Sequence, residues 1–324
     1  MQTPSATINC SPKMKLKHFK HLLISISNIF VEDILTYNGD VRFNEIGGAG
    51  PHAIAGMRVW YEDEIGLVAT VGHDFSEYRS RLNLLQVNLS GIQETKPKTT
   101  VAWQLFQPEG HRIQIFKDPA NHVDPPALAE DRLPNEFLSA DGYHIIWSGF
   151  PKEIIAFLTA LRRSNPEACI IQEPSPREVE NDQDYFKALF SLIDIYSPNL
   201  DEAIKIVNRV DLKEIINRFH IWGCKNISIR AGEKGSFFSD TKHIWYCPPS
   251  DSSLIDQTGA GNAYVGGLLV GSTYGTQSVE SSLAMAAVSA GFEMDGFGVH
   301  HFSSDIISER TRRYQEVLKA TECY

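Results

Sequence analysis

The second half of the sequence alternates short apolar runs with helix-like segments. From about residue 141, apolar runs occur at residues 143–147, 168–171, 192–196 and 226–229, and residues 152–163 have helical spacing. Apolar runs of this length, bounded by turn residues, are typical of buried strands. Their alternation with helices implies parallel strands joined by right-handed crossovers, with helices on both faces. The pattern therefore predicts an α/β fold with a mainly parallel central sheet, in which ligands bind at the carboxyl ends of the strands.

Two segments before residue 120 do not follow this alternation. Residues 34–46 alternate around Asn38-Gly39, a dipeptide typical of the type I′ hairpin turn. Residues 99–116 predict a second hairpin, with its turn at Pro108-Glu109-Gly110. We expect these hairpins, from about residues 34–46 and 99–118, to form a small sheet that acts as a lid.

A turn of small residues opens directly into an apolar helix at residues 256–267, DQTGAGNAYVGG. Backbone amides at the start of a helix lack internal partners, and the helix dipole adds partial positive charge there. Gly259, Ala260 and Gly261 therefore predict an anion hole suited to phosphate. The alternative is a tight connection, in which Gly266 and Gly267 only permit close helix packing.

Composition narrows the classes of partner. The 324 residues suffice for one large or two small domains. A net charge of −10 argues against a nucleic-acid partner, and no apolar run is long enough to span a membrane. The five cysteines are scattered and show no C-x-x-C spacing, which predicts reduced thiols and a cytoplasmic location.

Asn199 and Glu202 lie three residues apart at a predicted helix start. Both could face one water-bound Mg²⁺, which prefers a few oxygen ligands. They could equally form a capping box, with Asn199 as the N-cap residue and Glu202 as its partner. The pair alone leaves both interpretations open.

The segment 256–267 resembles the C-terminal signature of the ribokinase-like (PfkB) family of carbohydrate kinases. Four further segments, each at a predicted strand end, resemble the family's motifs in the same order: residues 47–53 (GGAGPHA), 71–75 (VGHDF), 196–202 (YSPNLDE) and 230–235 (RAGEKG). The resemblance covers roughly residues 20–300. It implies a ribokinase-like three-layer sandwich with a small β lid, and transfer of a phosphoryl group from ATP to a sugar or nucleoside hydroxyl in the presence of Mg²⁺.

The resemblance also implies roles for individual residues. Catalysis and the anion hole fall to Gly259, Ala260, Gly261 and Asn262, and nucleotide binding to Arg230, Gly232, Gly235 and Thr258. The substrate would meet Glu32, Asp33, Gly47, Gly48 and His52, and the metal and phosphates would meet Asn199, Glu202 and Asp256. Positions 256 and 258 often contribute to a monovalent-cation site in the family, so a potassium requirement is also open.

Three of these assignments keep alternatives. One of the neighbours Glu32 and Asp33 would grip the substrate, with the other solvated. His52 stands where most family members have Asn, so it either hydrogen-bonds a sugar hydroxyl or fills the pocket wall. Arg230 either grips a phosphate bidentately or is a surface charge.

The sequence departs from the family at Asn262, where the family has an Asp that takes the proton of the substrate hydroxyl. An amide is no base near neutral pH, and losing a general base costs about 10²- to 10⁴-fold in rate. A backbone anion hole survives this change, so we expect ATP binding to persist better than turnover, and Asn262→Asp to raise activity. Three outcomes stay open: a slow kinase in which His52 or Asp256 relays the proton, a pseudokinase that binds nucleotide or sugar, and a scaffold that uses its lid.

The domain organisation follows from these assignments. Residues 1–20 carry lysines and no acidic residue, which predicts a disordered tail, with a targeting presequence as the alternative. The resemblance implies a kinase domain over residues 21–310, and we expect residues 311–324 to be a C-terminal helix end or tail. Asn262 and the segment 287–293 (AVSAGFE) indicate a divergent subgroup, similar to the fungal maintenance-of-killer proteins. We expect small-molecule partners, and a homodimer through the lid is open.

Overall fold

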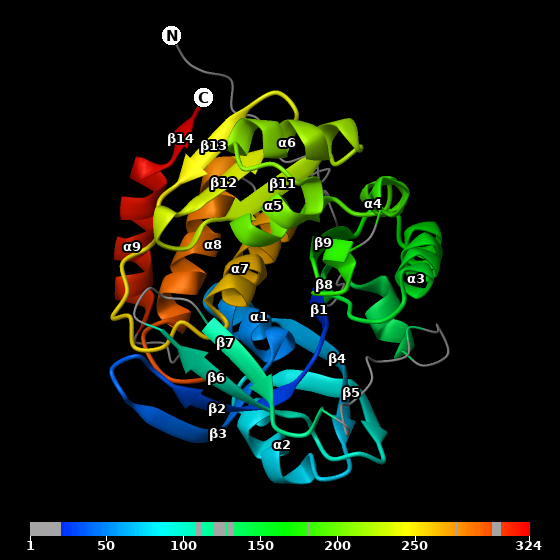
Figure 1. The fold of residues 1–324 in the computed structure, drawn as a ribbon, viewed down its shortest axis with the longest axis vertical. Coiled ribbons are helices and arrows are strands. Elements are labelled where there is room, and N and C mark those ends of the chain that lie inside the picture. The colour runs from blue at the N-terminus through cyan, green and yellow to red at the C-terminus, as the bar shows by residue number, and fades with distance from the viewer. Residues whose placement is uncertain are drawn as a thin grey trace.

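The computed structural model describes residues 21–107, 112–119, 128, 133–180, 182–275, 278–299 and 306–324. The predicted tail at 1–20 and the predicted turn at 108–110 lie outside the described residues. The described chain forms a large sheet covered by helices on both faces, with a smaller sheet beside it (Figure 1). The predicted α/β sandwich with a separate lid is therefore confirmed.

The central sheet is mainly parallel. Its strands are, in spatial order, β14 (Glu322–Cys323), β13 (Ile244–Cys247), β12 (Ser236–Ser239), β11 (Asn226–Arg230), β10 (Ile195–Tyr196), β9 (Cys169–Glu173), β8 (Gly142–Ile146), β1 (Leu22–Ile26), β4 (Glu64–Gly72) and β5 (Val87–Thr95). All pairs from β11 to β5 are parallel, and β11 to β14 pair antiparallel. Strands β1 and β9 are buried along their whole length, as expected for parallel strands covered on both faces.

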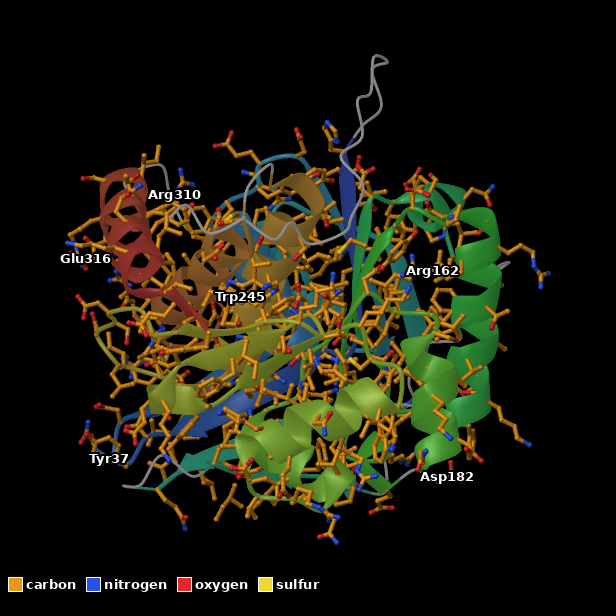
Figure 2. All side chains as sticks on the ribbon, turned by 90° about the horizontal axis from the view of Figure 1, so that it is seen from above. Tyr37, Arg162, Asp182, Trp245, Arg310 and Glu316 are labelled. Carbon is orange, nitrogen blue, oxygen red and sulfur yellow. The ribbon has the colours of Figure 1, made fainter. Side chains whose placement is uncertain are left out.

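The helices form two layers, each over its own hydrophobic cluster. One layer contains α1 (Ala49–Arg58), α7 (Ala260–Tyr274), α8 (Val279–Glu293) and α9 (Ile307–Ala320), and Leu82 of α2 (Ser76–Asn83) joins its cluster. The other contains α3 (Pro151–Ser164), α4 (Gln183–Phe190), α5 (Leu200–Val207) and α6 (Leu212–Ile221). Figure 2 shows Trp245 in the interior of the molecule and Glu316 at its periphery.

The C-terminal segment is an integral part of the domain. Residues 311–324 form most of α9 and the edge strand β14, which pairs with β13. The expected boundary at residue 310 therefore falls inside a helix. In the part of the chain that the structure describes, no helix combines the length and apolarity needed to cross a bilayer.

The lid is a four-stranded sheet in the order β3 (Val41–Gly47), β2 (Phe30–Leu35), β6 (Val101–Phe106) and β7 (Arg112–Phe116). Both predicted hairpins are present, and their first strands, β2 and β6, pair parallel. The predicted type I′ turn is wrong. The amide of Gly39 donates to the Thr36 carbonyl at 3.0 Å, and Gly39 has a left-handed φ of 89° whereas Asn38 does not. A type I turn followed by one left-handed glycine gives a longer loop with a bulge.

Candidate active site

A cavity of about 1020 Å³ opens where the carboxyl ends of the parallel strands meet the lid. Its wall contains the lid residues Tyr37 and Phe106, the start of α5 and the start of α7. The loop that follows β11 closes another side, at residues 230–235. Three predicted motifs from distant parts of the sequence therefore surround one space, which is large enough for a nucleotide.

The start of α7 faces this cavity and has no side-chain cap. Gly259 precedes the helix in a left-handed conformation, with φ 74°. Among the residues that the structure describes, the amides of Gly261 and Asn262 have no hydrogen-bond acceptor. Gly266 lies against the backbone of α1, where a Cβ would overlap the carbonyl of Ala53. Close helix packing and an open helix start are therefore both present, one turn apart.

Arg230 lies at the end of β11 and lines the cavity. Its Nη1 is 2.8 Å from Oε2 of Glu173, and its Nη2 donates to the Ser197 carbonyl at 2.8 Å. A Cβ at Gly261 would overlap Nη1, so the guanidinium lies directly beside the helix start. Only 13% of its side chain is exposed, so Arg230 belongs to the wall of the cavity and is not a solvated surface charge.

Glu173 is a functional candidate that sequence reasoning missed. It ends β9 and is almost completely buried. Its Oε1 accepts hydrogen bonds from His144 Nε2 at 2.7 Å and from Asn262 Nδ2 at 2.9 Å. Burial opposes ionisation, but the Arg230 guanidinium and the hydrogen-bond donors outweigh it and lower the pKa of Glu173. A charged residue at the carboxyl end of a predicted buried strand is the signal that could have identified it.

Asn199 and Glu202 form a reciprocal capping box at the start of α5. The Asn199 amide donates to Glu202 Oε2 at 2.8 Å, and the Glu202 amide donates to Asn199 Oδ1 at 2.8 Å. Glu202 Oε2 also lies 3.7 Å from Arg230 Nη2. Glu202 Oε1 has no partner among the described residues, so it could still hold a hydrated Mg²⁺ beside a phosphate. The described residues contain no cluster of three or more His, Cys, Asp and Glu side chains suited to a metal.

Asp256 and Thr258 shape the loop before α7. Asp256 is buried, and its two oxygens accept the amides of Thr258 at 2.8 Å and Gly298 at 3.2 Å. Thr258 Oγ1 is buried without a hydrogen-bond partner among the described residues. Gly232 and Gly235 line the cavity around a 3₁₀ turn, both with left-handed φ values.

His52 lies between two buried carboxylates. Its Nδ1 is 2.5 Å from Glu293 Oε1, and its Nε2 is 3.5 Å from Glu32 Oε2. Burial disfavours the imidazolium, but the hydrogen bonds to Glu293 and Glu32 outweigh burial and raise the pKa of His52 to about 10. A Cβ at Gly259 would overlap the His52 ring, so this cluster lies directly beneath the anion hole. A protonated ring with both nitrogens engaged is poorly placed to take a proton from a substrate.

Glu32 connects the same cluster to the lid. Its Oε1 accepts the Gly48 amide at 3.3 Å and Gln104 Nε2 at 2.9 Å. A Cβ at Gly47 would overlap the Glu32 carboxylate, which explains the glycine at that position. Gly47 and Gly48 therefore bring the chain close to Glu32 and the His52 cluster.

Asp33 lies on the other face of the same lid strand. It accepts the Asn44 amide at 2.8 Å and forms an ion pair with Lys117, whose ammonium lies 4.6 Å from the centre of the Trp103 ring. Only 2% of Asp33 and 2% of Glu32 are exposed, so the expectation that one of the two acids is solvated is wrong. Each finds its partners within the protein.

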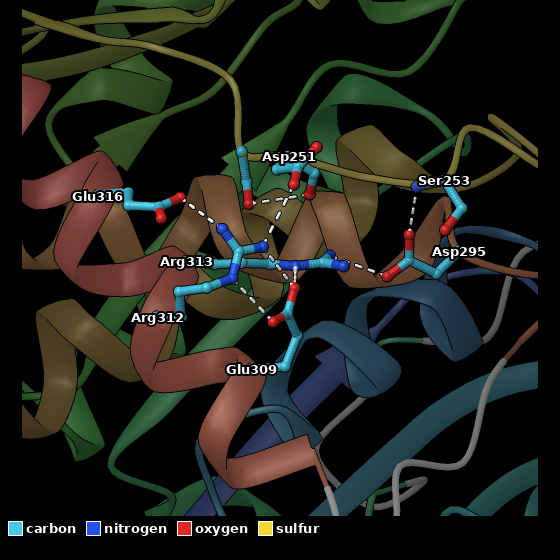
Figure 3. A network of polar contacts seen from close by, with 8 residues as sticks. Asp251, Ser253, Asp295, Glu309, Arg312, Arg313 and Glu316 are labelled. Atoms are coloured by element: carbon cyan, nitrogen blue, oxygen red, sulfur yellow. Dashed lines mark hydrogen bonds and ion pairs between the residues drawn. The ribbon is translucent and has the colours of Figure 1, made fainter.

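A network of ion pairs holds the loop at residues 251–255 against α9 (Figure 3). Its members are Asp251, Ser253, Asp295, Glu309, Arg312, Arg313 and Glu316. Hydrogen bonds from Arg312 and Arg313 lower the pKa of Glu309 to about 2, so this carboxylate is charged at every pH where the protein would work. The same loop lines the cavity at Leu254 and Ile255, so α9 supports one of its walls.

Comparisons with known proteins agree on one family. The model of the pfkB family of carbohydrate kinases matches residues 27–303. A cytidine kinase of Thermococcus kodakarensis is 26% identical, over 78% of this chain and 89% of that protein. A ribokinase II structure from E. coli, described as a complex with ATP and Mg²⁺, superposes with a TM-score of 0.70 at 19% identity, covering 92% of this chain and 98% of that one. A Burkholderia thailandensis nucleoside kinase in complex with inosine gives 0.69 at 18% identity, covering 91% and 97%.

Proposed function

The chain belongs to the pfkB family of carbohydrate kinases, and we propose that it transfers the γ-phosphoryl group of ATP to a hydroxyl of a sugar or nucleoside. The observation that supports this proposal is the uncapped start of α7, which faces the large cavity with Arg230 beside it. Backbone amides and a guanidinium together stabilise the negative charge of a phosphoryl group during its transfer. Gly232, Gly235 and Thr258 would contact the nucleotide.

The reaction has a simple balance. The acceptor oxygen forms a bond to the γ-phosphorus, the bond to the bridging oxygen breaks, ADP leaves with that electron pair, and the hydroxyl proton passes to water. Mg²⁺, held by Glu202 beside the capping residue Asn199, would neutralise charge on the phosphates. Asp256 and Thr258 offer buried oxygens that suit a monovalent cation such as K⁺.

The acceptor site would lie between the lid and the cluster of His52, Glu32 and Glu293. Both ring nitrogens of His52 contact carboxylates, so neither is available to hydrogen-bond a sugar hydroxyl. We therefore assign His52 to the wall of the site. Asp33 lies on the opposite face of β2, beside Trp103, so Glu32 is the acid of this pair that faces the proposed acceptor site. The acceptors to test are fructose- or ribose-like sugars, nucleosides and pyridoxal-type vitamers. We expect the protein to act in a reducing compartment such as the cytoplasm.

A second candidate function is nucleotide binding without turnover. It is favoured by Asn262, because the first turn of α7 carries an amide and no carboxylate of its own, and that amide donates to Glu173. The protein would then signal its nucleotide state through the lid, whose tip at Tyr37 lines the cavity.

We expect the protein to bind ATP and to turn over slowly, about 10²- to 10⁴-fold below the rate that a positioned general base would allow. Calorimetry with ATP, with and without MgCl₂, measures the binding. Formation of ADP over the acceptor panel, in KCl and in NaCl, measures the turnover and the potassium requirement. ATP binding without turnover of any acceptor would favour the second function, and absence of ATP binding would contradict both.

The outer face of the lid supports the further proposal that two copies pair there. Trp103 and Ile115 are cross-strand neighbours, and the Phe43 ring packs on Trp103 with 5.7 Å between centroids. Phe43 is 57% exposed and Ile115 is 47% exposed, so this face of the lid presents apolar side chains to solvent.

Phe43→Glu is therefore expected to convert a dimer to a monomer, because two like charges would meet in an apolar interface. Light scattering after size exclusion measures the mass. Ile221→Glu is a matched control, since Ile221 is 62% exposed at the end of α6, a helix that covers the central sheet. A wild type that is monomeric at high concentration would contradict the proposal.

A further inference from the structure

Glu173 connects the core of the sheet to the start of α7. Its Oε1 accepts from both His144 and Asn262, and its Oε2 pairs with Arg230. His144 is in turn 2.9 Å from the Ser25 hydroxyl, so the chain of contacts runs across the adjacent strands β1, β8 and β9. The carboxylate is thus held in place from behind by the sheet.

This contact fixes which way the Asn262 amide points. An ionised carboxylate only accepts hydrogen bonds, so the NH₂ group of Asn262 must face Glu173. The amide oxygen then points away from Glu173. Asn262 is half-buried, and its Oδ1 accepts no hydrogen bond from any described residue.

Glu173 itself is badly placed to act as a general base. It is buried behind Asn262, and three donors already occupy its two oxygens. Asn262, by contrast, offers a free oxygen beside the uncapped amides of α7. A hydroxyl that donates to this oxygen would be aligned with a phosphoryl group in the anion hole.

We propose that Glu173 is a positioning residue, which locks the Asn262 amide so that its oxygen accepts the hydrogen bond of the acceptor hydroxyl. The inference rests on the proposed function for its catalytic meaning. It adds that in this chain the amide lies at the start of α7 and the carboxylate that orients it lies at the end of β9. Turnover in this chain therefore depends on orientation and does not require a protein base at position 262.

The arrangement changes the expectation for Asn262→Asp alone. An Asp at this position would place a second carboxylate in contact with Glu173, and two like charges at hydrogen-bond distance cannot both ionise without cost. The exchange Glu173→Gln with Asn262→Asp keeps one carboxylate and one amide in contact, with their positions reversed. The two substitutions should therefore be strongly coupled.

A double-mutant cycle tests the proposal, with wild type, Asn262→Asp, Glu173→Gln and the double variant. We expect Glu173→Gln to lower kcat about tenfold or more with little change in ATP affinity, because the amide loses its fixed orientation. We expect the double variant to turn over at least about tenfold faster than Asn262→Asp. Its rate should also fall at acid pH, because the carboxylate introduced at position 262 becomes protonated there. Wild type should lack that acid limb.

Thermal unfolding of the same four proteins provides a readout that needs no turnover. Each single substitution is expected to lower the melting temperature. The decrease in the double variant should be smaller than the sum of the two single decreases. Glu178→Gln is the matched control, because Glu178 is another buried glutamate that contacts Tyr196 and Gln172, and its effect should add to that of Asn262→Asp. If no acceptor reacts but the unfolding data are coupled, the proposed function fails and the contact stands. Additive effects on both melting and turnover would overturn the inference.

Discussion

Replacing His52 with leucine is expected to lower the free energy of unfolding by about 3–5 kcal/mol, the cost of removing one partner from a buried ion pair. His52 is 1% exposed and lies between Glu293 and Glu32, which are equally buried. Leucine fills a similar volume, so the loss comes from two carboxylates that face each other without the cation between them. Urea unfolding at neutral pH measures the change.

The stabilisation by His52 is also expected to depend on pH. The pKa of His52 is about 10 in the folded protein, above its ordinary value of 6.5. The folded state therefore binds a proton that the unfolded state releases between these values, and the stabilisation is complete below about pH 6.5. It is lost as the pH rises from 6.5 towards 10, and His52→Leu should show a flatter profile over that range.

His243→Leu is a suitable control for this experiment. The side chain of His243 is 40% exposed beside Asp240, so its replacement removes an exposed polar contact that contributes little. A loss below about 1 kcal/mol for His52→Leu, equal to that of the control, would show that the cluster is held by packing and not by charge.

The sequence predicted those parts of the fold that depend on local pattern. The apolar runs gave the parallel strands β8, β9 and β11, because strands buried on both faces are continuous in their hydrophobicity. The uncapped helix start at Gly259 follows in the same way from small residues ahead of an apolar helix. The lid followed from two segments that break the alternation.

The contacts around the predicted residues could not be read from such patterns. Glu293 lies 241 positions from His52, and nothing in either neighbourhood indicates the other. Glu173 lies 89 positions from Asn262, and only the sheet brings β9 beside the start of α7. The sequence therefore located the site but left undecided which side chains are engaged with each other and which remain free for a ligand.

Gly259→Ala is expected to reduce turnover by about 10²- to 10³-fold, the loss typical of removing one donor from an anion hole, and to weaken ATP binding as well. The residue has a left-handed φ of 74°, and a Cβ here would overlap the His52 ring. His52 cannot move aside, because Glu32 holds it from the lid strand β2 and Glu293 holds it from α8. The helix start must therefore shift, and the amides of Gly261 and Asn262 lose their alignment.

Gly223→Ala separates this effect from the backbone cost of alanine. Gly223 also has a left-handed φ, of 98°, but a Cβ there meets no atom within 4 Å. Both variants should lose about 1 kcal/mol of stability for the strained backbone, and Gly259→Ala should lose about 1–3 kcal/mol more for the overlap. ATP binding, measured by calorimetry, should fall only in Gly259→Ala. Unchanged binding in that variant would mean that the nucleotide does not use the start of α7, and the proposed phosphoryl transfer would then have no anion hole to support it.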